Sequence, residues 1–277
     1  MLAVYAAAPL SLAPWLIEAP ASLAAQSRCD RTNEHHRDGW GLGWYEAGLH
    51  VQRSVAAACD DPEFTAAATS LKARIAFAHV RDASVGTIRP ENSHPFTYGP
   101  WLFCHNGTIE GFDRLRASFE RETLPALQAT RRGDTDSEQL FLWLLSNAAR
   151  EGFQLTADDQ TASGERPDVD GMYAVVRESL RRLLGWCAAI DVVAPTGLNL
   201  FLSDGRMLIA VRHSRTLWLQ HDATRQSARG AVVIASEPTD ADTGNENETE
   251  SSTPWRELPD PSILTIDASG RSTVRPF

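Results

Sequence analysis

The chain has 277 residues and a formal net charge of −10, from 36 acidic and 26 basic side chains. Lys72 is its only lysine, so no basic stripe is present to neutralise phosphates, and we expect no nucleic-acid partner. No run approaches the roughly 20 apolar residues that span a bilayer, so we also expect no membrane association.

Short β-rich segments bounded by Gly, Pro, Asp or Ser recur along the chain and predict strands. They lie at 2–7, 73–80, 100–105, 198–202, 207–212, 216–220, 231–235 and 263–266. The Asp-Gly pair at Asp204–Gly205 separates two of them, and such a pair tolerates the positive φ of a hairpin turn. We therefore expect the strands at 198–202 and 207–212 to be antiparallel neighbours.

Two helices are predicted between these strands. In the first, Thr135 caps the backbone, Glu138 reaches back three residues later, and an apolar face follows. In the second, an apolar stripe runs from Met172 to Cys187 and indicates a face packed in the core, where Cys187 is inert. The stretches 156–170 and 239–254 resemble mobile surface loops, but strand-like segments lie on both sides of each. We therefore expect one α+β domain over residues 1–277.

Three polar sites stand where strands end or a helix begins. Asn106 and Gly107 follow an apolar strand, so an amide and a backbone N–H could hold an oxyanion there, although Asn-Gly is also a common plain turn. Arg81 also follows a strand and could bind a carboxylate through two parallel hydrogen bonds, or form a surface salt bridge. Asp136 could serve the helix dipole or accept a ligand ammonium.

These sites occur in an ordered series of motifs. The motifs are RDGWGLGWYE at 37–46, FAHVRDAS at 77–84, ENSHPFTYGPWLFCHNGTIEGF at 91–112, GDTDSEQLF at 133–141, NLFLSDG at 199–205 and VIASEP at 233–238. In this series the chain resembles the class II glutamine amidotransferases. It is most similar to the short branch that hydrolyses γ-glutamyl amides in ergothioneine biosynthesis or glutathione breakdown. The resemblance implies a four-layer αββα sandwich of the N-terminal-nucleophile (Ntn) hydrolase type, with antiparallel sheets.

The resemblance also implies roles for particular residues. Asn106 and Gly107 match the oxyanion hole, Arg81 matches the residue that binds the substrate α-carboxylate, and Asp136 matches the acid that receives the α-ammonium. Ser84 stands where the family often has threonine and keeps the hydroxyl. A γ-glutamyl group is therefore the expected small-molecule ligand.

His94 and Trp40 match recurrent residues near the family's pocket, as substrate-binding residues or as scaffold.

The family's nucleophile has no counterpart in the numbered chain. Relatives begin Met-Cys-Arg, lose the methionine and attack with the cysteine thiolate while its α-amine transfers protons. This sequence begins Met1-Leu2-Ala3, and alignment with the family's first strand puts Met1 two or three residues too late. Two explanations stay open. Either the active protein carries a Met-Cys-Arg start upstream, or the chain is a pseudoenzyme that binds a γ-glutamyl compound or a protein partner.

Cys104 is the internal alternative, since strand alternation gives it the same facing as Asn106. It has no free α-amine and would need another base, so we expect it to pack in the interior rather than to attack. The four cysteines have neither disulfide density nor CxxC spacing, and we expect reduced thiols in a cytoplasmic protein.

No metal or organic cofactor is expected. Neither HxxxH nor HxH spacing occurs, and the adjacent His35 and His36 cannot easily converge on one ion. The glycines at 39–43 lack the third spaced glycine of a dinucleotide-binding loop, so we expect a tight connection between strands there. The sequence predicts neither an oligomeric state nor a partner protein.

Overall fold

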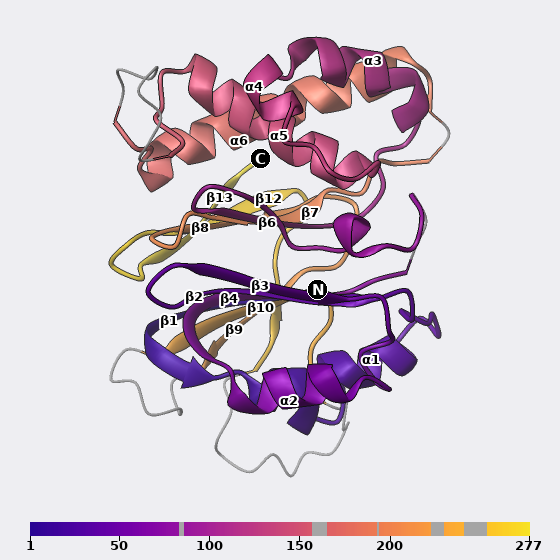
Figure 1. Cartoon of the computed structure of the whole chain (residues 1–277). Helices are drawn as coiled ribbons and strands as arrows, with labels where there is room; N and C mark the ends of the chain where they lie inside the picture. The colour runs from indigo at the N-terminus through magenta and orange to yellow at the C-terminus, as the bar shows by residue number, and fades with distance from the viewer. Residues whose placement is uncertain (83–85, 157–164, 193, 223–229, 241–253) are drawn as a thin grey trace. The chain divides into compact units, whose positions relative to one another are not determined.

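A computed structural model describes residues 1–82, 86–156, 165–192, 194–222, 230–240 and 254–277 (Figure 1). The chain divides into two compact units. Unit 1 comprises Met1–Ala83, Ile88–Pro95 and Thr216–Leu258, and unit 2 comprises Ser84–Thr87, Phe96–Arg215 and Pro259–Phe277. Each unit takes in separated stretches, so no single cut in the chain divides them.

Unit 1 is an antiparallel sheet with short helices on one face (Figure 1). The strands run in the order β11-β9-β10-β1-β4-β2-β3. Their bounds are Leu2–Ser11 (β1), Trp40–Tyr45 (β2), Leu49–Ser54 (β3), Lys72–Val80 (β4), Trp218–Asp222 (β9), Ala231–Ala235 (β10) and Arg256–Glu257 (β11). The helices are the π-type turn Pro14–Glu18 (η1), Leu23–Arg28 (α1), Pro62–Ser70 (α2) and the 3₁₀ turn Pro90–Asn92 (η2).

The core of unit 1 lies between the sheet and its helices. Leu2 and Val4 of β1 and Ala76 and Ala78 of β4 belong to it, together with Phe64 of α2. Because successive side chains of a strand point to opposite faces, Met1, His79 and Arg81 share the other face of this sheet.

Unit 2 is a second antiparallel sheet, in the order β13-β12-β8-β7-β6-β5, with longer helices on one face (Figure 1). Its strands are Phe96–Tyr98 (β5), Trp101–Asn106 (β6), Asn199–Ser203 (β7), Leu208–Arg212 (β8), Ser262–Ile266 (β12) and Ser272–Pro276 (β13). Its helices are Phe112–Glu122 (α3), Pro125–Gln128 (α4), Asp136–Arg150 (α5) and Val169–Ala189 (α6). None of the described helices is long and apolar enough to cross a membrane.

Most of the predicted elements are present. Strands β7 and β8 pair antiparallel across the Asp-Gly turn, as expected. Thr135 caps α5 by accepting a hydrogen bond from Glu138 N at 3.2 Å. The Glu138 carboxylate, however, bonds to the N–H groups of Arg132 and Gly133, at 2.9 and 2.6 Å, so it closes the preceding loop rather than a reciprocal capping box.

Two expectations are corrected by the structure. The glycine-rich 39–43 segment is not a connection: it starts strand β2. Gly41 is needed there because a Cβ would lie 1.9 Å from the His94 carbonyl oxygen, where the chain crosses close to the strand. Helix α6 begins at Val169, inside the expected loop 156–170, since Asp168 caps it by accepting from Gly171 N at 2.8 Å. Residues 157–164 and 241–253 of the two expected loops lie outside the described residues.

Candidate functional site

The predicted site residues fall in both units. Arg81, His94 and Trp40 belong to unit 1, whereas Asn106, Gly107 and Asp136 belong to unit 2. Ser84 lies outside the described residues.

In unit 1, the beginning of β1 lies in the middle of the sheet, between β4 and β10. Leu2 is opposite both Ala78 and Ala235. The Met1 amino group donates to Ser236 Oγ at 3.0 Å, and Ser236 N donates to the Met1 carbonyl oxygen at 2.9 Å. The ladder between β1 and β10 therefore continues through Met1.

Arg81 directly follows β4 and extends the pairing of β4 with β2. Its N–H donates to Gly39 O at 2.8 Å, and its carbonyl accepts from Asp38 N at 2.9 Å. The residue is 4% exposed. Both its backbone N–H and its carbonyl are thus bonded to the segment that leads into β2.

His94 and His79 form a buried pair in unit 1. Their ring centroids are 4.3 Å apart with 32° between the planes. His79 shares a sheet face with Arg81, so the structure brings His94 near the side of the sheet that carries Arg81.

Trp40 is placed differently. It is fully buried in the core of unit 1, its ring packs edge-on against Phe64, and its Nε1 donates to Asp61 Oδ2 at 2.8 Å. Of the two roles that the sequence left open for Trp40, this position favours scaffold.

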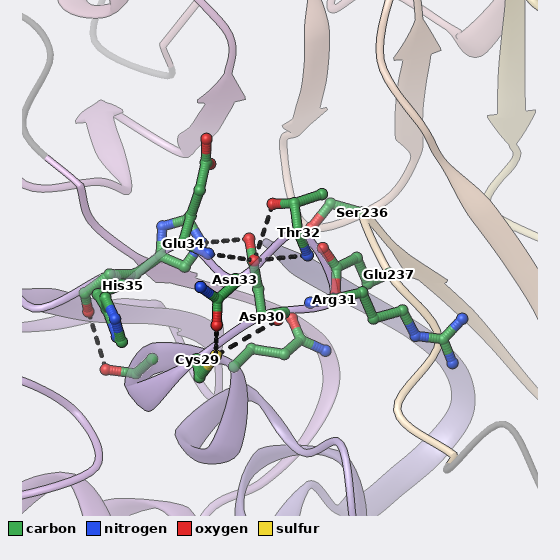
Figure 2. A network of polar contacts seen from close by, with 12 residues as sticks. Cys29, Asp30, Arg31, Thr32, Asn33, Glu34, His35, Ser236 and Glu237 are labelled. Carbon is green, nitrogen blue, oxygen red and sulfur yellow. Dashed lines mark hydrogen bonds and ion pairs between the residues drawn. The ribbon is translucent and has the colours of Figure 1, made fainter.

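A polar loop follows α1 beside Ser236 (Figure 2). Arg31 N donates to Glu237 Oε2 at 3.2 Å. Asp30 Oδ1 accepts from Thr32 N, Thr32 Oγ1 and Glu34 N, and Asp30 Oδ2 lies 2.9 Å from His36 Nε2. Possible metal-ligand atoms of Asp30, Glu34 and His36 lie within 4.8 Å of one another. The hydrogen bonds of the loop already account for this geometry, so we assign no ion to it.

In unit 2, the chain after β6 is held in a tight turn. A Cβ on Gly107 would lie 2.1 Å from the Gly197 carbonyl oxygen, so only glycine fits. Gly197 N donates to Thr108 O at 3.2 Å, and its carbonyl lies 3.0 Å from His105 Nε2. The 105–108 backbone is therefore fixed against the segment that leads into β7.

The beginning of α5 holds the other end of this turn. Asp136, the first residue of the helix, is 3% exposed, and its Oδ2 accepts from Ile109 N at 2.9 Å. Ser137 Oγ lies 3.2 Å from Asp136 Oδ1 and 2.9 Å from His105 Nδ1. Asp136 is thus bonded to the residue that directly follows the 105–108 turn, which contains Asn106 and Gly107.

Asn106 differs from its buried neighbour His105. It is half-buried, and none of the described residues bonds to its side-chain amide. An amide donor beside Gly107 on a held turn, with no partner among the described residues, is an arrangement that can hold a developing oxyanion.

Cys104 and Cys187 are both buried. Burial raises the pKa of the Cys187 thiol, consistent with an inert packing residue.

Sequence reasoning missed His105, Ser137 and Gly197. His105 and Ser137 adjoin predicted site residues in the sequence, and that adjacency was their only signal. No sequence signal pointed to Gly197, because its contact with His105 is made by a backbone carbonyl, which every residue has.

A sequence model of the class II glutamine amidotransferases matches residues 16–235, which include every predicted site residue. The chain belongs to this family. A γ-glutamyl-hercynylcysteine sulfoxide hydrolase of Mycolicibacterium smegmatis is 27% identical over 266 residues, covering 94% of this chain and 92% of the relative. A probable glutamine amidotransferase of Saccharomyces cerevisiae is 25% identical over 276 residues, covering 88% and 73%.

Solved structures agree on the fold of this amidotransferase. A glutamine aminotransferase class-II domain protein from Silicibacter pomeroyi superposes with a TM-score of 0.64 at 23% identity, covering 100% of this chain and 98% of that one. The glutamine phosphoribosylpyrophosphate amidotransferase of B. subtilis gives 0.62 at 15% identity, covering 99% of this chain and 48% of that one. The expected α+β class of Ntn type, with antiparallel sheets, is confirmed.

Proposed function

We propose that this amidotransferase hydrolyses a γ-glutamyl amide and releases glutamate and an amine. The observation that carries the proposal is the held turn of unit 2, where Asp136 Oδ2 accepts from Ile109 N and none of the described residues bonds to the nearby Asn106 amide. The relative named as a γ-glutamyl-hercynylcysteine sulfoxide hydrolase, which is matched over nearly its full length, supports the same substrate class.

Within this proposal, Asn106 and the Gly107 N–H stabilise the oxyanion of the tetrahedral intermediate. The motif match assigns the α-ammonium of the γ-glutamyl group to Asp136, and its α-carboxylate to Arg81 and Ser84. His94 supports the Arg81 side of the sheet in unit 1.

The nucleophile is proposed to be a cysteine upstream of Met1. Continuing the pairing of Leu2 with Ala78 places Met1 opposite His79, and the second residue upstream opposite Arg81. Alternation puts that residue on the same face as Met1 and Arg81. A Met-Cys-Arg start that has lost its methionine has cysteine at this position, so the register agrees with the spacing expected from the motifs.

The chemistry follows from this placement. The α-amino group of the cysteine takes the proton of the thiol, the thiolate attacks the γ-carbonyl carbon, and the negative charge develops on the carbonyl oxygen. The C–N bond breaks as the resulting ammonium gives that proton to the leaving amine. Water, deprotonated by the same amine, then cleaves the thioester and releases glutamate.

The experiment compares a protein carrying the Cys-Arg extension with the chain that begins at Met1. The extended protein should hydrolyse glutamine or a γ-glutamyl conjugate, and cysteine to alanine should abolish turnover. Arg81→Lys in the extended protein should raise KM, since lysine keeps the charge but cannot make a forked contact. If the processed extended protein is inert towards glutamine, γ-glutamyl dipeptides and γ-glutamyl hercynyl compounds alike, hydrolysis is wrong and a binding role takes its place.

The chain that begins at Met1 sharpens this test. It should bind glutamate without hydrolysing glutamine, because its proposed binding residues all lie downstream. Glutamate release that is lost in Cys104→Ala would instead identify Cys104 as the nucleophile. A cytoplasmic location also remains a proposal, which cell fractionation would test.

A further inference from the structure

The imidazole of His105, a residue of β6 in unit 2, lies against helix α5. His105 is 1% exposed. Ser137 and Phe141, four residues apart, share a face of α5 and lie over His105 and Phe103, two residues apart on β6. The Phe103 and Phe141 rings stack at 5.1 Å, and His105 Nδ1 lies 2.9 Å from Ser137 Oγ. Helix and strand thus hold the imidazole between them.

The hydrogen bonds of His105 assign its tautomer. Nε2 lies 3.0 Å from the Gly197 carbonyl oxygen, which can only accept a hydrogen bond. In a neutral ring the hydrogen is therefore on Nε2, and Nδ1 is an acceptor. The donor at Nδ1 must then be the Ser137 hydroxyl.

This assignment settles a conflict at Ser137. Its oxygen is also 3.2 Å from Asp136 Oδ1, but a hydroxyl has one hydrogen and can donate to one of these acceptors. If the hydrogen points to His105, Asp136 Oδ1 has no hydrogen to accept from Ser137. Oδ2 is already bonded to Ile109 N, so Oδ1 is the oxygen left for an external donor.

We propose that His105 is a positioning residue: it draws the Ser137 hydrogen away from Asp136 and keeps Oδ1 open for the α-ammonium of the ligand. This rests on the proposed function, because it takes Asp136 as the ammonium acceptor. It adds a residue that touches no substrate and acts through Ser137.

The electrostatic surroundings agree with a neutral ring. Burial lowers the pKa of His105 and outweighs Asp136 and the bond to Gly197, which raise it, and the Arg215 guanidinium lowers it further. If His105 were protonated, Nδ1–H would donate to Ser137 Oγ, and Ser137 would turn its hydrogen to Asp136. The ammonium would then compete with an internal donor.

The test uses two replacements that each keep one of the two hydrogen-bonding positions of the imidazole, Nδ1 or Nε2. Asparagine places an acceptor at the Nδ1 position, so His105→Asn should still hold the Ser137 hydrogen. Glutamine reaches the Nε2 position and can donate to Gly197, but leaves Ser137 free to bond Asp136. Ser146→Ala is the matched control, because Ser146 is a buried serine of the same helix whose hydroxyl bonds to Leu142 O at 2.8 Å.

Calorimetric titration of the chain with L-glutamate should show dissociation constants near wild type for His105→Asn and Ser146→Ala. His105→Gln should weaken binding about tenfold, the scale of one hydrogen bond to a charged group. Adding Ser137→Ala to His105→Gln should restore affinity to within about threefold of wild type, since the competing hydroxyl is gone. In the extended enzyme the same pattern should appear in KM rather than in kcat.

A merely structural role predicts the opposite, because two deletions in one packed network would weaken binding at least as much as one. A double variant as weak as His105→Gln, or His105→Asn as weak as His105→Gln, would overturn the proposal. So would nitrogen-15 NMR of the imidazole showing Nδ1–H or an imidazolium at pH 7. If wild type neither binds glutamate nor, when extended, hydrolyses γ-glutamyl amides, the proposed function fails, and the NMR result still decides the tautomer.

Discussion

Each unit has a buried aspartate at the beginning of a helix, and the two differ in what their oxygens bond. Asp61 caps α2 in unit 1: Oδ1 accepts from Glu63 N at 2.9 Å, and Oδ2 accepts from Trp40 Nε1 at 2.8 Å. Asp136 begins α5 in unit 2, where Oδ2 accepts from Ile109 N and, of the described residues, Oδ1 meets only the Ser137 hydroxyl.

The donors explain the difference. An indole N–H and a backbone N–H are fixed in direction, so one oxygen of Asp61 stays bonded to β2 and the other to α2, with Ser54 as a further side-chain donor. The Ser137 hydroxyl can rotate and has another acceptor in His105. Each Asp61 oxygen is therefore held by a rigid donor, whereas Asp136 Oδ1 has only a rotatable donor among the described residues, which is the difference that the proposed role of Asp136 requires.

The largest expected effect comes from removing the Asp136 charge. Asp136→Asn keeps an oxygen for Ile109 N but loses the attraction for an ammonium, so kcat/KM of the extended enzyme should fall about 100-fold, equal to about 2.7 kcal/mol. Steady-state kinetics with a γ-glutamyl amide would measure it, with Asp61→Asn as the matched control. An equal loss of kcat/KM in Asp136→Asn and Asp61→Asn would show that Asp136 has no role that Asp61 lacks.

A smaller effect is expected in the stability of the Asp61 variant. In Asp61→Asn one of the two carboxylate oxygens becomes an NH₂ group. Either Trp40 Nε1 or Glu63 N then faces this NH₂ group and loses its acceptor. The free energy of unfolding should therefore fall by about 1–3 kcal/mol, as for a buried donor left without its acceptor. Urea unfolding would show the loss, and kcat/KM should stay unchanged.

The sequence predicts an element of this fold when the residues that determine the element are neighbours in the chain. Strands such as β10 and the cap at Thr135 follow from neighbouring residue types, and both were predicted. Strand β2 was not, because Gly41 is explained only by the His94 carbonyl, which approaches from a distant part of the chain.

The same limit applies to the candidate site. Asp136, Asn106, Gly107 and Arg81 were found because they stand at element ends, and the resemblance added Ser84, His94 and Trp40. The linkage through His105 and Ser137 depends on α5 lying over β6 in one register, which no spacing in the sequence reveals. Trp40 carried a family motif, but only the structure shows that its ring packs in the core.

The smallest effect is confined to acidic solution and tests the indole bond itself. Burial raises the pKa of the Asp61 carboxyl, but the hydrogen bonds from Trp40, from Glu63 N and from Ser54 together lower it below its usual 3.8. A carboxyl whose folded-state pKa is lowered stabilises the fold above the unfolded-state pKa, and this stabilisation is lost as the pH falls through the folded-state pKa.

Trp40→Phe keeps an aromatic ring against Phe64 but removes the N–H donor, so the pKa of Asp61 should rise. The loss of stability on acidification should then shrink relative to wild type, in urea unfolding measured between pH 5 and about pH 2. An unchanged pH dependence in Trp40→Phe would mean that the indole does not hold this carboxylate, and the contrast with Asp136 would then rest on Glu63 N and Ser54.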